Sequence, residues 1–137
     1  MANFARVGNK KHGCLIDNDK QVIIYYDQLS LYEKLKKKDS EIIVKYSDIE
    51  LVKVCYGIAT GVRFDSAQIT LEIHTINHHQ YDFQISYELN ITDNFKLFIR
   101  LLLKSGLQIE DPHNLLNLVL HTDQNLLDLI KEVSHYK

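Results

Sequence analysis

Four side chains able to bind a metal or transfer protons gather in one short stretch. They are His74, His78, His79 and Asp82. Residues 69–75 and 81–87 each alternate apolar and polar side chains, which predicts the two strands of a hairpin. His74 and Asp82 are then expected to be cross-strand neighbours, a geometry open to imidazole and carboxylate ligands of a transition metal. The alternative is an exposed polar turn whose histidines titrate near neutral pH.

The expected pairing of these two strands follows from the face that both turn toward the core. Apolar side chains on both strands must point to the same core, which predicts Ile73 opposite Phe83 and Leu71 opposite Ile85 around a turn at 77–79. Dedicated zinc sites recruit a further ligand, and no other histidine or cysteine stands in a metal-binding spacing. We therefore assign no metal and no cofactor.

A second chemical feature is a run of basic residues. It comprises Lys34, Lys36, Lys37 and Lys38. Lysines at a loop tip can each contribute about 1 kcal/mol toward an anionic membrane surface. The alternative is a solvated tip whose charge protects a sheet edge from further pairing. The segment 29–38 that carries the run fits either a strand or a short helix, and this choice stays open.

Signatures of catalysis and of nucleic-acid binding are missing from the sequence. There is no G-x-S-x-G elbow and no glycine-rich phosphate loop, so we predict that the protein is not an enzyme. Cys14 and Cys55 lie within apolar runs, where free thiols are usually inert. The net charge of −2 gives no global attraction to nucleic acid. The first residues lack the apolar region of a signal peptide, which predicts a cytoplasmic protein.

The elements that would position these residues are mostly short strands. Residues 12–17 and 21–26 predict a hairpin behind a polar lead-in at 1–11. Residues 41–46 and 51–56 predict two more strands, joined by a one-turn interruption at 47–50.

At Thr92 the apolar period changes to that of a helix, expected over about 92–105. Thr92 suits its N-cap and Gly106 its end. The predicted apolar stripe comprises Phe95, Phe98, Ile99, Leu102 and Leu103.

Beyond Gly106 the sequence predicts two further helices. Asp111 and Pro112 are expected to start the first, and Thr122-Asp123 separates it from the second. Their apolar side chains either complete the core or form a surface for a partner or a second copy. The residues of that candidate surface are Leu115, Val119, Leu126 and Ile130.

Two segments carry a resemblance to a known superfamily. Gly13-Cys14-Leu15-Ile16-Asp17, followed by the apolar run 22–26, resembles the first hairpin of GRAM and bacterial pleckstrin-homology (PH)-like domains. Tyr46-Ser47-Asp48-Ile49-Glu50 resembles that family's D-I turn, in which the isoleucine enters the core. The hairpin at 69–85 and the helix at 95–103 fall where the family has its last strands and its closing helix.

The resemblance covers about residues 12–105 and implies an α+β fold. We expect a PH-like antiparallel β-barrel or two packed sheets of about six to seven strands, closed by the helix at 92–105. Residues 1–137 would form one domain, with 106–137 as a helical extension. The superfamily's lipid-binding pattern of spaced basic residues is absent, so lipid binding is not carried over.

The sequence therefore predicts a non-catalytic module acting through protein contacts or self-association. Two alternatives remain: a binder of anionic lipid headgroups at residues 34–38, and a metal-binding protein at the 74–82 hairpin. The expected partner is another protein or a second copy of the chain. A membrane surface is less favoured, and nucleic acid is not expected.

Overall fold

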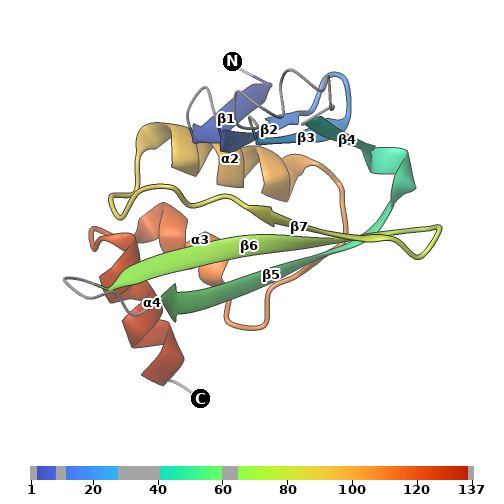
Figure 1. The fold of residues 1–137 in the computed structure, drawn as a ribbon. Coiled ribbons are helices and arrows are strands. Elements are labelled where there is room, and N and C mark those ends of the chain that lie inside the picture. Colours follow the sequence, from blue (N-terminus) through green and yellow to red (C-terminus); the bar gives the residue numbers. More distant parts are fainter. Residues whose placement is uncertain (1–2, 9–11, 28–40, 60–64, 136–137) are drawn as a thin grey trace, which may run out of the picture.

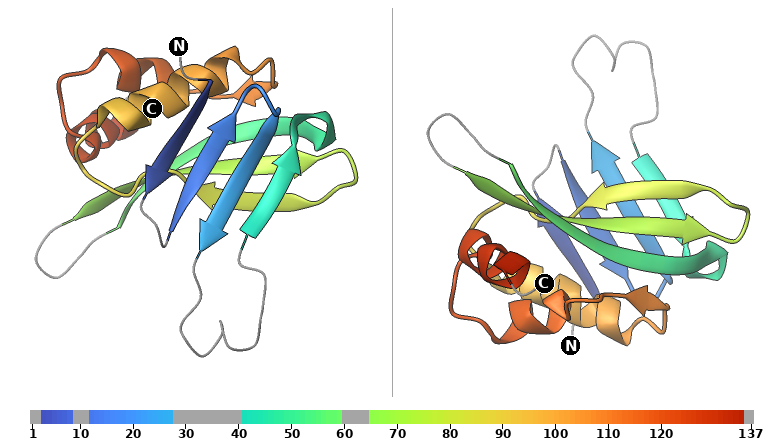
Figure 2. Two further views of the ribbon diagram at one scale, coloured as in Figure 1. Left: turned by 90° about the horizontal axis from the view of Figure 1, so that it is seen from above. Right: turned by 90° about the horizontal axis from the view of Figure 1, so that it is seen from below.

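Two β-sheets and three helices make up the described part of the chain. The computed structural model describes residues 3–8, 12–27, 41–59 and 65–135. Figure 1 shows the two sheets as separate layers, and Figure 2 shows their strands crossing and the helices gathered at one side. Two packed sheets were expected and are present. The described residues contain eight strands rather than six to seven, and they form two separate sheets with no closed barrel.

The first sheet has the order β1-β2-β3-β4, and all its neighbours are antiparallel. Its strands are β1 (Phe4–Gly8), β2 (His12–Asp17), β3 (Val22–Asp27) and β4 (Glu41–Lys45). The predicted β2–β3 hairpin is confirmed. The prediction of a polar lead-in at 1–11 was wrong for residues 4–8. Ala5 and Val7 alternate with exposed residues and reach the core, a period of two that is easily missed in so short a strand.

A 3-10 turn, η1 (Tyr46–Asp48), carries the chain from the first sheet to the second. The Tyr46 hydroxyl donates to Asn18 Oδ1 (2.5 Å), and Asn18 Nδ2 donates to the Leu101 carbonyl (3.0 Å). This chain of hydrogen bonds connects the corner, the β2–β3 turn and a helix. Ile49 follows the turn and is buried, as the D-I motif implies.

The second sheet has the order β7-β6-β5-β8. Its strands are β5 (Ile49–Ala59), β6 (Ser66–Thr75), β7 (Gln80–Gln84) and the two-residue β8 (Ile109–Glu110), which runs parallel to β5. Tyr25 on β3 stacks on Phe83 of β7 with ring centroids 4.8 Å apart. The core therefore lies between the two sheets.

The predicted face of the β6–β7 hairpin is confirmed, but its register was wrong. Leu71 lies opposite Phe83 and Ile73 opposite Tyr81. The cause is the turn, in which Thr75 N donates to the His79 carbonyl (2.9 Å) and His79 N donates to Thr75 Oγ1 (3.0 Å). This pair centres the turn on residue 77 instead of 78, so every partner shifts by two residues and the core face is kept.

Helix α2 (Asp93–Lys104) follows β7 and packs against β1 and β2. Its predicted cap is confirmed, since Thr92 Oγ1 accepts from Phe95 N (3.1 Å). Gly106 ends the helical region with φ of +83°, a conformation that favours glycine. One stripe position was wrong: Leu101 is buried, whereas Leu103 is 40% exposed.

Two shorter helices complete the fold, α3 (Leu115–His121) and α4 (Leu126–His135). Helix α3 packs on α2 and α4, while α4 packs on β5 and β6. No helix among the described residues has the length and apolar character needed to cross a membrane.

Candidate functional site

A cavity lies between α3 and α4, and the segments that start these helices shape it. Helix α3 begins at Leu115, three residues later than predicted from Pro112. The Asp111 carboxylate still caps it, because Oδ2 accepts from Leu116 N (2.8 Å). Asn114, which lies between Asp111 and the first residue of α3, has a left-handed backbone with φ of +54°. Asn125 caps α4, because its Oδ1 accepts from Asp128 N (2.8 Å).

The four side chains proposed as a partner surface do not form one. Leu115, Val119, Leu126 and Ile130 are 0–1% exposed. They occupy the core, which was the other interpretation of the sequence. The helices have to be placed before this is visible, because an apolar stripe looks the same whether it faces a sheet or a partner.

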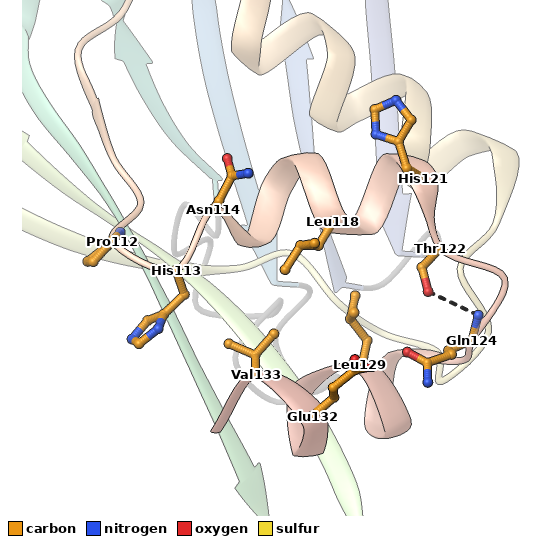
Figure 3. Close-up of a pocket in the computed structure, with 10 residues that line it drawn as sticks. All are labelled: Pro112, His113, Asn114, Leu118, His121, Thr122, Gln124, Leu129, Glu132 and Val133. Carbon is orange, nitrogen blue, oxygen red and sulfur yellow. Dashed lines mark hydrogen bonds between the residues drawn. The ribbon is translucent and has the colours of Figure 1, made fainter. Parts of the chain in front are cut away.

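A different set of residues opens to solvent as a groove of about 620 Å³. Figure 3 shows Leu118 pointing from α3 toward Leu129 and Val133 on α4. Leu118 is 38% exposed, whereas Leu129 and Val133 are almost buried and form the floor. The polar residues that line the groove are His113, Asn114, His121, Thr122, Gln124 and Glu132.

The two ends of the groove differ in chemistry. At one end, the ring of His113 meets Tyr56 edge to face, with centroids 5.3 Å apart. At the other end, His121 Nδ1 lies 2.8 Å from the Asn117 carbonyl. A carbonyl only accepts, so Nδ1 donates, and Nε2 is left as an acceptor when the ring is neutral. Glu132 supplies the one carboxylate of the lining.

The side chains that line the groove differ in what they can contribute chemically. The lining contains no cysteine, serine or lysine, and its one hydroxyl, on Thr122, accepts from Gln124 N (3.1 Å). The lining side chains offer apolar contact, hydrogen bonds and a negative charge. Sequence reasoning missed the groove; its one available signal was Leu118, the leucine of α3 that lies off the buried stripe.

The histidine hairpin does not gather as predicted. His74 faces Gln80, and Asp82 faces Glu72. His74 Nε2 lies 2.6 Å from Glu72 Oε1 on its own strand. His78 and His79 are exposed in the turn. Within the described ranges, no three histidine, cysteine or acidic side chains are grouped so that they could hold a metal ion.

Cys55, the second cysteine, lies beside the contact between His74 and Glu72. Cys55 Sγ is 3.8 Å from Glu72 Oε2 on the outer face of the second sheet. Burial, followed by the negative charge of Glu72, raises the pKa of the Cys55 thiol. Cys14 is fully buried, and burial alone raises the pKa of its thiol. Both environments disfavour the thiolate, so neither cysteine is an activated nucleophile.

The remaining candidate, Lys34, Lys36, Lys37 and Lys38, lies outside the described residues. Comparison with models of protein families, with curated proteins and with solved structures finds no match to this chain.

Proposed function

We propose that this chain is a cytoplasmic, non-catalytic PH/GRAM-like module that acts through protein contacts. The order of its elements supports the proposal. Strands β1–β4 form one antiparallel sheet, β5–β7 lie in a second, and the amphipathic helix α2 follows them. The tight turn at Tyr46–Asp48 and the buried Ile49 also support the proposal, because the resemblance implies a turn that brings the isoleucine into the core.

The observation that carries the protein-contact function is the groove between α3 and α4. Its volume of about 620 Å³ lies within the usual range for ligand pockets, about 300–1,000 Å³. The floor of Leu129 and Val133 offers a place for an aliphatic side chain. Glu132 on the wall offers a partner for a cation, and the groove lining contains no lysine or arginine.

The occupant that fits these features is a short protein segment with an aliphatic residue next to Lys or Arg. The aliphatic side chain would lose its contact with water on the groove floor, and the cation would lie near Glu132. Gln124 lies at one end of the groove, where its amide can bond to the backbone of the segment.

Selection from a displayed peptide library tests this function. We expect the wild-type chain to enrich peptides with a branched aliphatic residue adjacent to Lys or Arg. Leu118→Asp should abolish the enrichment, because it places a charge on the apolar wall. Glu132→Lys should shift the enriched neighbours from basic to acidic residues.

Leu103→Asp is the matched control. Leu103 is exposed to nearly the same degree as Leu118, at 40% against 38%, but lies on α2 outside the groove. This variant should select the same peptides as the wild type. The proposal fails if no peptides are enriched, or if Leu118→Asp and Leu103→Asp behave alike while both retain the wild-type circular dichroism spectrum.

A further inference from the structure

Among the described strands, β4 lies at an edge of its sheet and has an apolar centre. It is the last strand of its sheet, as Figure 2 shows, and among the described elements it packs extensively only on β3. Its sequence is EIIVK. Ile43 at its centre is 57% exposed and Ile42 is 37% exposed. Exposed apolar edges of this kind are templates for pairing with a further strand.

The hydrogen-bond pattern shows which backbone groups of β4 point away from β3. Tyr46 N donates to the Gln21 carbonyl (2.9 Å), so this pair is of the hydrogen-bonded type. Antiparallel pairs alternate in type along a ladder. In the observed register, Val44 and Ile42 therefore bond to β3. The N–H and C=O groups of Glu41, Ile43 and Lys45 point away from it.

These three residues are complementary to themselves. When two copies of EIIVK are placed antiparallel with Ile43 at the centre, Ile43 lies opposite Ile43 of the partner subunit. Glu41 then lies opposite Lys45 of the partner subunit, and the reverse pair forms at the other end. All three positions have outward backbone groups, so the three pairs that they make are of the hydrogen-bonded type, and they alternate with non-hydrogen-bonded pairs between Ile42 and Val44 of the partner subunit. Opposite charges facing each other across strands stabilise the pairing.

The side chains fit the same register. Val44 is buried toward the core, so the alternation of the strand places Glu41, Ile43 and Lys45 together on the outer face. Beside β4 a cleft of about 210 Å³ is lined by Ile43 and by Ile76 of the β6–β7 turn. Ile76 is 59% exposed. A strand laid along β4 would cover apolar surface on both.

We propose that two copies of this chain pair through β4, antiparallel about a two-fold axis at Ile43, and join their four-stranded sheets into one of eight strands. The inference rests on the register and charges of β4 and is independent of the groove. A pairing of five residues a side is a small interface, so we expect a concentration-dependent equilibrium between monomer and dimer.

Charge reversal gives a sharp test by analytical ultracentrifugation over a concentration series. Glu41→Lys faces Lys45 of the partner subunit at both ends, and Lys45→Glu faces Glu41 of the partner subunit at both ends. Each variant should weaken the dimer roughly tenfold or more, because two attractive pairs become repulsive. An equimolar mixture of the two variants should form a heterodimer, since each pair is again of opposite charge. The double variant E41K/K45E should recover wild-type association.

Backbone and surface controls complete the design. Ile43→Pro removes an outward N–H while leaving the bonds to β3, so it should also favour the monomer. Leu118→Asp in the groove should leave dimerisation unchanged, which separates this proposal from the peptide-binding function.

A wild-type chain that stays monomeric overturns the proposal. So does a dimer that persists in Glu41→Lys, or single variants that weaken association with no recovery in the mixture and the double variant. Loss of the dimer on Leu118→Asp alone would place the contact at the groove and also overturn it.

Discussion

Replacing Leu116 by alanine and Leu118 by alanine tests whether the last two helices belong to the core. Both leucines lie on α3, two positions apart, but Leu116 is 1% exposed and Leu118 is 38% exposed. Leu→Ala removes three carbon groups, a transfer loss of about 2.4 kcal/mol at about 0.8 kcal/mol for each buried group. The cavity left at Leu116 brings the expected loss in the free energy of unfolding to about 2–5 kcal/mol. At Leu118 the space opens to the groove, and we expect about 1 kcal/mol or less.

Urea denaturation followed by circular dichroism measures both values. The slope of the unfolding free energy against urea has to match the wild type for the two variants to be compared. Equal losses for Leu116→Ala and Leu118→Ala would refute the assignment of α3 to the core.

Truncation after Gly106 extends the same test. It removes seven buried apolar side chains: Leu115, Leu116, Val119, Leu126, Leu129, Ile130 and Val133. At about 1.5–3 kcal/mol each, their gross burial contributes about 10–20 kcal/mol, against a typical net stability of about 5–15 kcal/mol. We expect the shortened chain to lose its cooperative transition. A shortened chain that unfolds cooperatively near the wild-type midpoint would contradict the reasoning.

Three further predictions concern single groups. Glu72→Gln should lower the raised pKa of Cys55 and so speed its alkylation at mildly alkaline pH, because a thiolate forms more readily without the adjacent carboxylate; the rate against pH measures this, and an unchanged profile contradicts it. Tyr46→Phe should cost about 1–2 kcal/mol of stability in urea, since it leaves Asn18 Oδ1 without its donor; a change near zero would show that water replaces the bond. For the lysine run at 34–38, converting residues 36–38 to glutamine should abolish any salt-sensitive co-sedimentation with anionic vesicles; binding that survives the change excludes this run as the contact.

Features set by local chemistry were predicted from the sequence. Thr92 caps α2 because its hydroxyl accepts from a donor three residues away, and no distant contact is needed to foresee this. The core face of the β6–β7 hairpin follows from alternation alone. The one-turn interruption predicted at 47–50 is present as the 3-10 turn Tyr46–Asp48, so its existence was predicted but its bounds were one to two residues late.

The β6–β7 register and the start of α3 were not predicted correctly, because each has two local backbone arrangements to choose between. The register of β6–β7 depends on the hydrogen bonds between Thr75 and His79 that close the turn. A turn centred one residue later would keep the same side chains on the core face. The start of α3 depends on Asn114 adopting a left-handed conformation, which lets Asp111 cap a helix that begins after Pro112. In each case two arrangements satisfy the same apolar pattern, so the pattern cannot choose between them.

The two proposed contact surfaces differ in how far the sequence alone could reveal them. The groove requires the packing of α4 on β5 and β6, because only then does Leu118 remain on the outside. The complementarity of EIIVK is visible in the printed sequence. This complementarity matters for pairing only if β4 lies at the edge of its sheet, as it does among the described strands. It also requires the backbone groups of Glu41, Ile43 and Lys45 to point outward, which follows from the hydrogen bond from Tyr46 to Gln21. With the opposite phase, the outward groups would belong to Ile42 and Val44, and the two charged residues would bond to β3. Antiparallel pairing centred on Ile43 therefore depends on one hydrogen-bond phase, and the charge-reversed mixture tests that phase directly.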